Sequence, residues 1–341
     1  MNRLYLPFII TLIFLFIISC NKEQVIFKEI EFQISEHILP DYFVISIDFD
    51  SKGNAWIGTF KQGMIKYNDG QTTIYNSENS LIPDSAVIRD IKVDNYDNIW
   101  LGTYGLIKFD GTTFDFFNTQ NSPLLENIVW SIGIDKNNII WLASCRFKQG
   151  GLMSFDGTTW KSYTPENSLL PANGVKDIVV DNNNNVWLAM SEIVNNACLV
   201  KIRNGEWTIY DDSALGFRPY YFGNLAIGRN NILIASLDYG LSSMWDITRP
   251  NIIHFDGYKC TIINPVDEYE NSLGYVGVVN TDSEGNIWAS IEGNVELAVF
   301  NGEKWYYNEP DCPFEGVFAI ETDLQDRIWV GTGTGIYIIE K

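Results

Sequence analysis

Short apolar runs alternate with polar turns along the chain, in units of similar length. In the second unit, residues 87–93 (VIRDIKV) alternate between apolar and polar side chains, and 99–103 (IWLGT) form a short apolar run. Two further runs follow, 106–110 (LIKFD) and 114–118 (FDFFN), with Gly, Asn or Asp between them. Such alternation, interrupted by turn residues, is typical of β-strands joined by tight turns. Each unit is therefore predicted to be a four-stranded sheet, and no long helical periodicity follows residue 25.

A phrase such as DNYDNIWLG (94–102) recurs along the chain. Its tryptophan occupies the same position in six units: Trp56, Trp100, Trp141, Trp187, Trp288 and Trp329. The spacings are 44, 41, 46, 101 and 41 residues, and Leu233 takes the tryptophan position within the long gap. The chain thus holds seven units, of which the fifth is degenerate. Periods in the low forties match one propeller blade, which predicts an all-β, seven-bladed β-propeller of four-stranded antiparallel blades.

The aspartate that opens each phrase admits two interpretations. Runs such as DSKGN (50–54) and DNNNN (181–185) superficially resemble calcium loops, but they lack the alternating acidic ligands and closing glutamate of an EF-hand. Asp and Asn side chains bond nearby backbone N–H groups and tolerate left-handed conformations, which favours a tight turn. The recurring tryptophan is expected to fill the space between neighbouring sheets as part of the core.

The last unit is one strand short, because the chain ends at GIYIIEK (335–341), its third strand. Residues 25–34 (VIFKEIEFQI) precede the first unit and have the pattern of a fourth strand. An incomplete last blade would leave sheet edges exposed. We therefore predict that this N-terminal strand completes the seventh blade and closes the ring, so that the propeller occupies 25–341.

Several units share a longer pattern. Residues 93–111 read VDNYDNIWLGTYGLIKFDG, and 281–290 (TDSEGNIWAS) and 322–339 (TDLQDRIWVGTGTGIYII) repeat much of it. These units resemble the two-component regulator propeller repeat, across about 25–341. In that family such repeats form the extracytoplasmic sensors of membrane hybrid histidine kinases, often concerned with glycans. No kinase or regulator domain follows the last unit, so the resemblance implies a stand-alone propeller.

The charge narrows the range of partners. The chain of 341 residues carries 23 Lys and Arg against 43 Asp and Glu, a formal net charge of −20. Such a surface repels polyanions, so we expect no nucleic acid partner.

The N-terminus indicates export and a lipid anchor. Residues 4–18 form an apolar run that is short for a membrane span and suits a signal peptide. The IISC that follows resembles a bacterial lipoprotein box, which predicts removal of 1–19, acylation of Cys20 and a polar tether over 20–24. The alternative is an uncut signal anchor. The expected location is the cell envelope, lipid-anchored to a bacterial membrane, with the outer membrane favoured and the domain periplasmic or surface-exposed.

Little in the sequence suggests catalysis, a metal or another cofactor. The other cysteines, Cys145, Cys198, Cys260 and Cys312, lack the close spacing of zinc ligands, and no disulfide among them is assigned. The repeats also look something like those of streptogramin lyases, whose chemistry relies on histidine. This chain has only His37, expected in the first outer connection, and His254, expected in a third strand. We therefore expect no cofactor and no enzyme.

Three departures from the repeat mark one face of the predicted ring. Residues 144–151, 190–198 and 236–251 lengthen the connection between second and third strands in three consecutive units. They are expected to form a raised wall on the face where the first strands begin. In repeat proteins, such departures are where specificity is built, because binding residues gather on loops over a rigid framework.

The candidate ligand-binding residues surround this face. Five positions before the turn aspartate or its counterpart, the first strands carry Ile45, Arg89, Trp130, Lys176, Gly223, Gly277 and Phe318. The candidates are Arg89, Trp130 and Lys176 from this set, with Arg146, Tyr239, Trp245 and Arg249 from the insertions. Aromatic faces stack on sugar rings and guanidinium groups grip carboxylates. Alternatively, Trp130 packs between blades and the cations pair with local carboxylates.

The leading hypothesis is a non-enzymatic, membrane-tethered extracytoplasmic propeller with a sensor-like role. Its partner would be a glycan or a protein at the insertion-rich face. A protein–protein interaction scaffold is the close alternative, because propellers offer broad rigid surfaces. A propeller lyase or hydrolase is the least favoured, since no catalytic motif rises above background.

Overall fold

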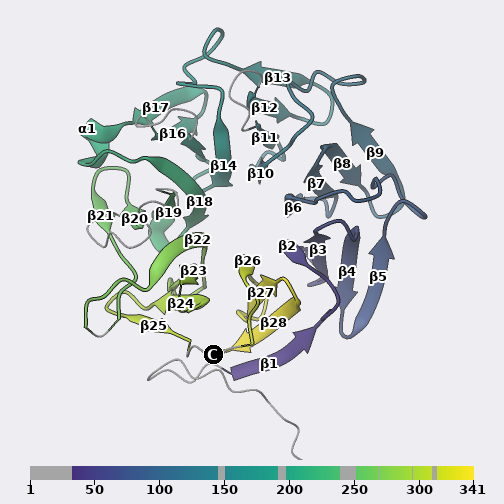
Figure 1. Ribbon diagram of the computed structural model, residues 1–341. Helices are drawn as coiled ribbons and strands as arrows, with labels where there is room; N and C mark the ends of the chain where they lie inside the picture. The colour runs from purple at the N-terminus through teal and green to yellow at the C-terminus, as the bar shows by residue number, and fades with distance from the viewer. Residues whose placement is uncertain are drawn as a thin grey trace, which may run out of the picture.

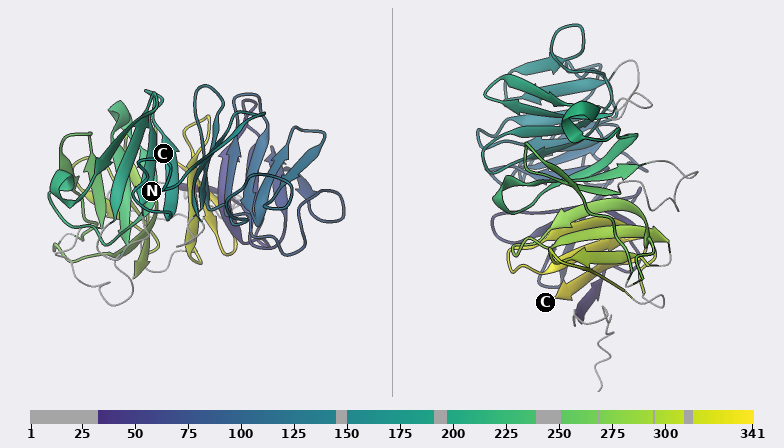
Figure 2. Two further views of the ribbon diagram at one scale, coloured as in Figure 1. Left: turned by 90° about the horizontal axis from the view of Figure 1, so that it is seen from above. Right: turned by 90° about the vertical axis from the view of Figure 1, so that its left-hand side faces the viewer.

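Seven four-stranded antiparallel sheets stand around a central axis and form a seven-bladed β-propeller (Figure 1). The structure, a computed structural model, describes residues 33–144, 150–190, 197–238, 251–267, 269–293, 295–308 and 313–341. Seen from the side, the blades pack next to one another in a thick disc, and their turns gather on its two faces (Figure 2). The prediction of fold class is confirmed.

Blades 1 to 4 each take four consecutive strands, from the axis outward. Blade 1 holds β2 (Val44–Phe49), β3 (Ala55–Thr59), β4 (Met64–Asn68) and β5 (Gln71–Tyr75). Blade 2 holds β6 (Asp90–Val93), β7 (Ile99–Thr103), β8 (Gly105–Phe109) and β9 (Phe114–Phe117). Blade 3 holds β10 (Ser131–Ile134), β11 (Ile140–Ser144), β12 (Gly151–Phe155) and β13 (Trp160–Tyr163). Blade 4 holds β14 (Val175–Val180), β15 (Val186–Met190), β16 (Cys198–Arg203) and β17 (Glu206–Tyr210).

The remaining blades follow the same plan until the last. Blade 5 holds β18 (Tyr221–Ile227), β19 (Leu233–Asp238), β20 (Ile252–Phe255) and β21 (Cys260–Ile262). Blade 6 holds β22 (Gly274–Thr281), β23 (Ile287–Gly293), β24 (Leu297–Phe300) and β25 (Trp305–Tyr307). Blade 7 holds β26 (Val317–Thr322), β27 (Ile328–Thr332), β28 (Gly335–Glu340) and β1 (Gln33–Ile38). A short helix, α1 (Asp212–Leu215), and a 3₁₀ turn, η1 (Arg229–Asn231), lie between strands. Among the described residues, no helix has the length and apolar character needed to cross a membrane.

The N-terminal strand closes the ring, as predicted, but it lies later in the chain than the predicted range. β1 pairs antiparallel with β28, and Ile34 is buried in the core of blade 7. The described strand covers 33–38 instead of the predicted 25–34, of which 25–32 lie outside the described residues. His37 is consequently in β1 and not in the outer connection: its ring stacks on Tyr337 at 4.0 Å between centroids. The alternation of EFQISEHI continues past Ile34, so the pattern alone could not fix the end of the strand.

The recurring aspartate is a turn residue, which confirms the prediction. Asp94 accepts hydrogen bonds from the backbone N–H groups of Tyr96 and Asn98 (both 2.9 Å) and from Trp100 Nε1 (3.0 Å). Burial alone would raise the pKa of Asp94, but these hydrogen bonds outweigh it and lower the pKa. The carboxylate oxygens are thus occupied by donors from their own turn, by Trp100 and by Asn138 of the next turn.

The tryptophans are core residues, as predicted, with one correction in blade 5. All six are buried between neighbouring sheets. In the other blades, the tryptophan lies six residues after the turn aspartate. In blade 5, Gly228 stands in place of that aspartate, so Ile234 occupies the position of the tryptophan. Leu233 instead packs toward blade 4, whereas Ile234 packs toward blade 6. The sequence alignment was one residue off because it lacked the aspartate as a reference.

The turn phrase also joins each blade to the next through a hydrogen bond that we name the clasp. The residue after the turn aspartate donates its backbone N–H to an Asp or Asn side chain in the following turn. The clasps join Ser51 to Asp97, Asn95 to Asn138, Lys136 to Asn184, Asn182 to Asn231 and Ser283 to Asp326, at 2.6–3.0 Å. Every acceptor has a left-handed backbone, with φ of 60–63°. Glycines occupy the acceptor position in blades 1 and 6, at Gly53 and Gly285, so these two interfaces lack the clasp.

Asp94→Asn is expected to lower the free energy of unfolding by about 2 kcal/mol at pH 7, because an amide nitrogen replaces an acceptor of charge-assisted bonds. The pKa of Asp94 is lower in the folded chain than in the unfolded chain, where it is about 3.9. The contribution of Asp94 to the free energy of unfolding is therefore complete at pH values above about 3.9 and is lost as the pH falls through the folded pKa. Urea unfolding should therefore show the largest difference from wild type near neutral pH. Asp115→Asn, at an exposed position on β9, is the control; equal losses in both variants would contradict the role of the turn.

Candidate functional site

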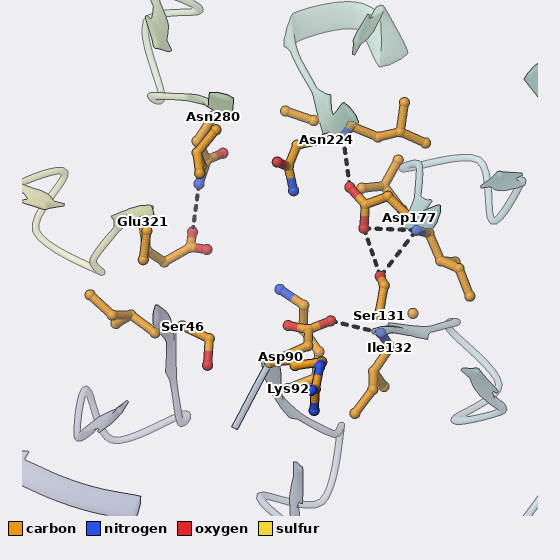
Figure 3. A pocket seen from close by; sticks show the side chains of 18 of the residues that line it. Ser46, Asp90, Lys92, Ser131, Ile132, Asp177, Asn224, Asn280 and Glu321 are labelled. Atoms are coloured by element: carbon orange, nitrogen blue, oxygen red, sulfur yellow. Dashed lines mark hydrogen bonds between the residues drawn. The ribbon is translucent and has the colours of Figure 1, made fainter. Parts of the chain in front are cut away.

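The first strand of every blade lines a central channel, and this channel is the candidate site. Its walls come from β2, β6, β10, β14, β18, β22 and β26, and they enclose about 560 Å³. Figure 3 looks into the channel, where Asp90, Asp177, Asn224, Asn280 and Glu321 project from different blades. Such a volume suits a small ligand.

Three predicted residues meet at one end of the channel, and we name this group the mouth: Arg89, Trp130 and Lys176. Arg89 Cζ lies 5.2 Å and Lys176 Nζ lies 4.7 Å from the ring centroid of Trp130. One cation comes from each neighbouring blade. The indole side chain is 37% exposed, so it is not packed away between the blades. The indole ring of Trp130 therefore positions two cations at the mouth, and the faces of the indole are not free for stacking on a sugar.

Neither cation pairs with a carboxylate in the part of the chain that the structure describes. Within the described ranges, no ion pair joins Arg89 or Lys176 to a carboxylate, which is the arrangement that the alternative interpretation expected. Burial lowers the pKa of Arg89, but arginine stays charged. The mouth thus presents two cations that lack an anionic partner in this part of the chain.

Irregular backbone aims the mouth residues inward. In β2, β14 and β26 the pairing register skips one residue, and the skipped residues are Ile45, Lys176 and Phe318. Arg89 and Trp130 directly precede β6 and β10. A bulge re-aims a side chain at the end of a strand, which explains why this position faces the channel.

The other predicted site residues lie outside the described residues. These are Cys20, Arg146, Tyr239, Trp245 and Arg249. Most of the three insertions is outside as well, so the raised wall stays a prediction.

Below the mouth lies a charged cluster that the sequence analysis did not single out. Lys92 stands among four carboxylates from four blades, Asp48, Asp90, Asp177 and Glu321. All five belong to first strands, at positions two or four residues before the turn aspartate. Their alternation with buried apolar residues was the available signal, because every second residue of a first strand must face the channel.

Burial dominates the electrostatics of this cluster. Removal from water raises the pKa of Asp90 to about 7 and raises those of Asp48, Asp177 and Glu321. Burial alone would lower the pKa of Lys92, but the carboxylates, Asp90 first, raise it. The cluster therefore holds one firm positive charge and an excess of carboxylates that resist ionisation.

The carboxylates also hold neighbouring blades together. Asp48 Oδ2 accepts the backbone N–H of Val93, and Asp90 Oδ2 accepts that of Ile132, both at 2.7 Å. Asp177 Oδ2 accepts the N–H of Leu225 at 2.7 Å, and its Oδ1 accepts Ser131 Oγ at 2.6 Å (Figure 3). A structural role therefore accounts for part of the cluster.

Asn224 differs from these side chains. Its side-chain amide projects into the channel (Figure 3). Its backbone N–H donates to Ser236 Oγ and its backbone carbonyl accepts from it, whereas the side-chain amide makes no hydrogen bond with another described residue. It therefore offers a free donor and a free acceptor to a ligand.

The histidines and the described cysteines lie away from the channel. His254 is in β20, a third strand, as predicted, and His37 is in β1. Cys198 and Cys260 are free thiols, and burial raises the pKa of Cys198 to about 12. Within the described ranges, no group of three or more His, Cys, Asp or Glu side chains is placed to hold a metal ion.

Comparison with known proteins defines the fold class alone. No family model and no curated protein matches the chain. Solved structures that resemble it include the extracellular domain of the hybrid two-component system BT4673 from B. thetaiotaomicron, at 14% identity and a TM-score of 0.63. The match covers 92% of this chain and 39% of that one, so the chain spans about two fifths of the length of this relative.

Two other similar structures are a lyase and YCF48. Virginiamycin B lyase from Staphylococcus aureus is 15% identical with a TM-score of 0.68, covering 91% of this chain and 99% of the lyase. YCF48 from Cyanidioschyzon merolae is 12% identical with a TM-score of 0.64, covering 89% and 98% respectively. The fold is thus shared by extracellular sensor domains, an enzyme and other propellers, and the function has to be argued from the site.

Proposed function

We propose that this chain is a non-enzymatic, extracytoplasmic binding propeller whose ligand is a glycan bearing carboxylate groups. The observation that carries the proposal is the mouth, where Arg89 and Lys176 flank Trp130 without a carboxylate partner among the described residues. In a chain with a net charge of −20, two such cations at a channel opening are complementary to an anion.

The depth of the channel limits where an anion can bind. Below the mouth, the single positive charge of Lys92 already faces four carboxyl groups, Asp48, Asp90, Asp177 and Glu321, whose ionisation burial disfavours. A second anionic group would be repelled there, whereas neutral hydroxyl groups could approach. The ligand is therefore expected to place its carboxylate at the mouth and its uncharged part over the channel.

Uncharged hydrogen-bonding groups favour a sugar over a simpler anion. The free amide of Asn224 can both donate to and accept from a hydroxyl group. The channel carboxylates can accept hydrogen bonds from hydroxyl groups. An acidic sugar combines these features, since it carries one charge among several hydroxyl groups.

Two observations support binding without catalysis outside the cytoplasm. The catalytically inactive form of virginiamycin B lyase carries a histidine-to-alanine substitution, whereas His37 and His254 both lie away from the channel. The two-component relatives of similar fold are extracellular domains. A lipid tether at Cys20 to the outer membrane completes the proposal, and membrane fractionation of Cys20→Ala tests that part.

A protein partner is the second candidate, because exposed aromatic residues lie near the mouth: Phe318 lines the channel, and Tyr104 lines a cavity together with Arg89. Phe60, Tyr104 and Phe318 are 39%, 65% and 42% exposed, and Phe43 packs between Phe60 and Phe318 at 5.3 and 4.6 Å. Aromatic residues of this kind are enriched in protein interfaces.

The chain from residue 21 onward is expected to bind acidic oligosaccharides, but not the same oligosaccharides after reduction of their carboxyl groups. Arg89→Gln and Lys176→Gln should each weaken binding at least tenfold in isothermal titration calorimetry. A charge-assisted hydrogen bond is worth about 1.5–3 kcal/mol, and 1.4 kcal/mol corresponds to a factor of ten.

Lys108→Gln is the matched control, because Lys108 also lies over a tryptophan, Trp100, at 5.6 Å but away from the mouth. It should bind as wild type. Equal affinity for acidic and reduced oligosaccharides would contradict the proposal. Retention of a co-purified protein that is lost in Arg89→Gln would favour the second candidate, and cleavage of the bound glycan would overturn the absence of catalysis.

A further inference from the structure

A second cavity lies on the outer side of the ring, between blades 5 and 6. It is a groove of about 750 Å³ bordered by β20 and β21 on one side and by β24 and β25 on the other. Its apolar and aromatic lining consists mainly of Ile262, Ile263, Phe300, Trp305 and Tyr307. It shares no lining residue with the central channel.

The groove lies where the repeat loses two aromatic rings. In three other blades, the tryptophan of the second strand stacks on a tyrosine of the fourth strand. These pairs are Trp56–Tyr75, Trp141–Tyr163 and Trp187–Tyr210, with centroids 6.0, 5.8 and 5.6 Å apart. In blade 5 the corresponding residues are Ile234 and Ile263, as the pairing of β19 with β20 and the hydrogen bond from Ile263 N–H to Ile252 O show.

The opposite wall keeps its aromatic residues. Phe300 and Trp305 of blade 6 lie 5.2 Å apart. Their counterparts in blade 3, Phe155 and Trp160, contact Phe117 of the preceding blade at 5.7 and 5.6 Å. Ile263 takes the position of Phe117, so the wall of blade 6 faces an isoleucine instead of a ring.

His254 also lines the groove, beside the charged residues Asp267, Glu303 and Lys304. His254 pairs with Ile234 in the position where Lys66, Lys108 and Lys201 cover tryptophans in other blades. Burial lowers the pKa of His254, so its imidazole is neutral at pH 7. A neutral heteroaromatic ring suits an apolar, planar neighbour better than an ammonium group does.

We infer that the groove between blades 5 and 6 binds a planar aromatic or heteroaromatic molecule of about the size of indole. Such a molecule has the shape of the side chains that fill this place in other blades. It would pack between Ile263 and the aromatic wall of blade 6, with offset or edge contacts to Phe300 and Trp305. This inference is independent of the proposed function at the mouth.

Indole itself is the probe for the experiment, and saturation-transfer NMR with the full folded chain is the measurement. Wild type should give a saturable signal. Ile263→Phe should weaken binding at least tenfold, because it restores the ring that blade 2 carries at Phe117. Ile209→Phe is the matched control, since it adds the same ring to an exposed position of β17, and it should bind as wild type.

A second variant separates loss of the site from loss of folding. Phe300→Leu removes one aromatic wall without filling the groove, and it should weaken indole binding several-fold. The thermal midpoint of Ile263→Phe should stay at or above that of wild type, which would show that this variant folds. Arg89→Gln at the mouth should leave indole binding unchanged. Absence of a saturable signal from wild type, or equal binding by Ile263→Phe, would overturn the inference.

Discussion

Replacement of Lys92 by methionine is expected to lower the free energy of unfolding by about 3–5 kcal/mol at pH 8, the usual cost of removing one partner from a buried group of charges. Lys92 is the one positive charge among the four channel carboxylates, and methionine preserves its length while removing that charge. Each carboxylate would then lose its compensating charge in a site that already disfavours ionisation. Urea unfolding at pH 8 measures the loss.

The pH dependence distinguishes this effect from simple mispacking. The pKa of Asp90, about 7 in the folded chain, exceeds the unfolded value of about 3.9. A carboxyl with a raised folded pKa destabilises the folded state as the pH rises between these two values, and its cost is absent below the lower one. The difference between Lys92→Met and wild type should therefore be smaller at pH 5 than at pH 8.

A second substitution tests the cause directly. In the Lys92→Met background, Asp90→Asn removes one charge and keeps an oxygen that can accept the N–H of Ile132, so it should restore at least 1 kcal/mol at pH 8. Lys108→Met, at a cation on β8 of the same blade, is the control and should cost far less. An equal loss at both pH values, without restoration by Asp90→Asn, would mean that Lys92 acts through packing alone.

Deletion of Gln33–Ile38 is expected to destabilise the ring by roughly 5 kcal/mol or more. Loss of Ile34 alone equals a large-to-small change in the core, worth about 2–5 kcal/mol, and the deletion also removes the pairing of β1 with β28. β28 would become an exposed edge whose side chains, including Ile336 and Ile338, are buried in the intact blade. Such an edge is prone to association with other chains. The thermal midpoint and light scattering measure the two effects.

Addition of the missing strand as a peptide is the sharper test. A synthetic peptide of residues 33–40 should pair with β28 in the deleted chain, raise its thermal midpoint in a saturable way and suppress association. The same peptide with Ile34→Asp should fail, because it places a charge in the core of blade 7. If the deleted chain melts as wild type does, the ring does not depend on this closure.

The repeat made the fold predictable, because one physical requirement is written many times. Each copy of the phrase supplies an aspartate that holds a turn and a tryptophan that packs against the next blade. The pattern can therefore be recognised from the other copies even where one copy departs from it. Blade 5 shows the limit. Without the aspartate, the alignment placed Leu233 where the structure has Ile234, and a shift of one residue exchanges the two faces of a strand.

The site was only partly predictable. Arg89, Trp130 and Lys176 were found because charged and aromatic residues stand out at one repeat position, and the structure brings them together. The cluster around Lys92 was missed, because its members occupy two different positions of the repeat and face one another only after the ring closes. The groove between blades 5 and 6 was missed for a different reason. It lies where blade 5 lacks the aromatic rings that other blades carry, and the isoleucines at these positions, Ile234 and Ile263, do not stand out in the sequence.

The clasp has a consequence for how such a ring could arise and change. Five of the seven turns, those of blades 2, 3, 4, 5 and 7, carry an acceptor side chain toward one neighbour together with a backbone N–H toward the other. A newly duplicated unit would therefore fit between any two existing ones without compensating substitutions. The two interfaces with Gly53 and Gly285 have no acceptor side chain, so the ring closes without the clasp at those two places.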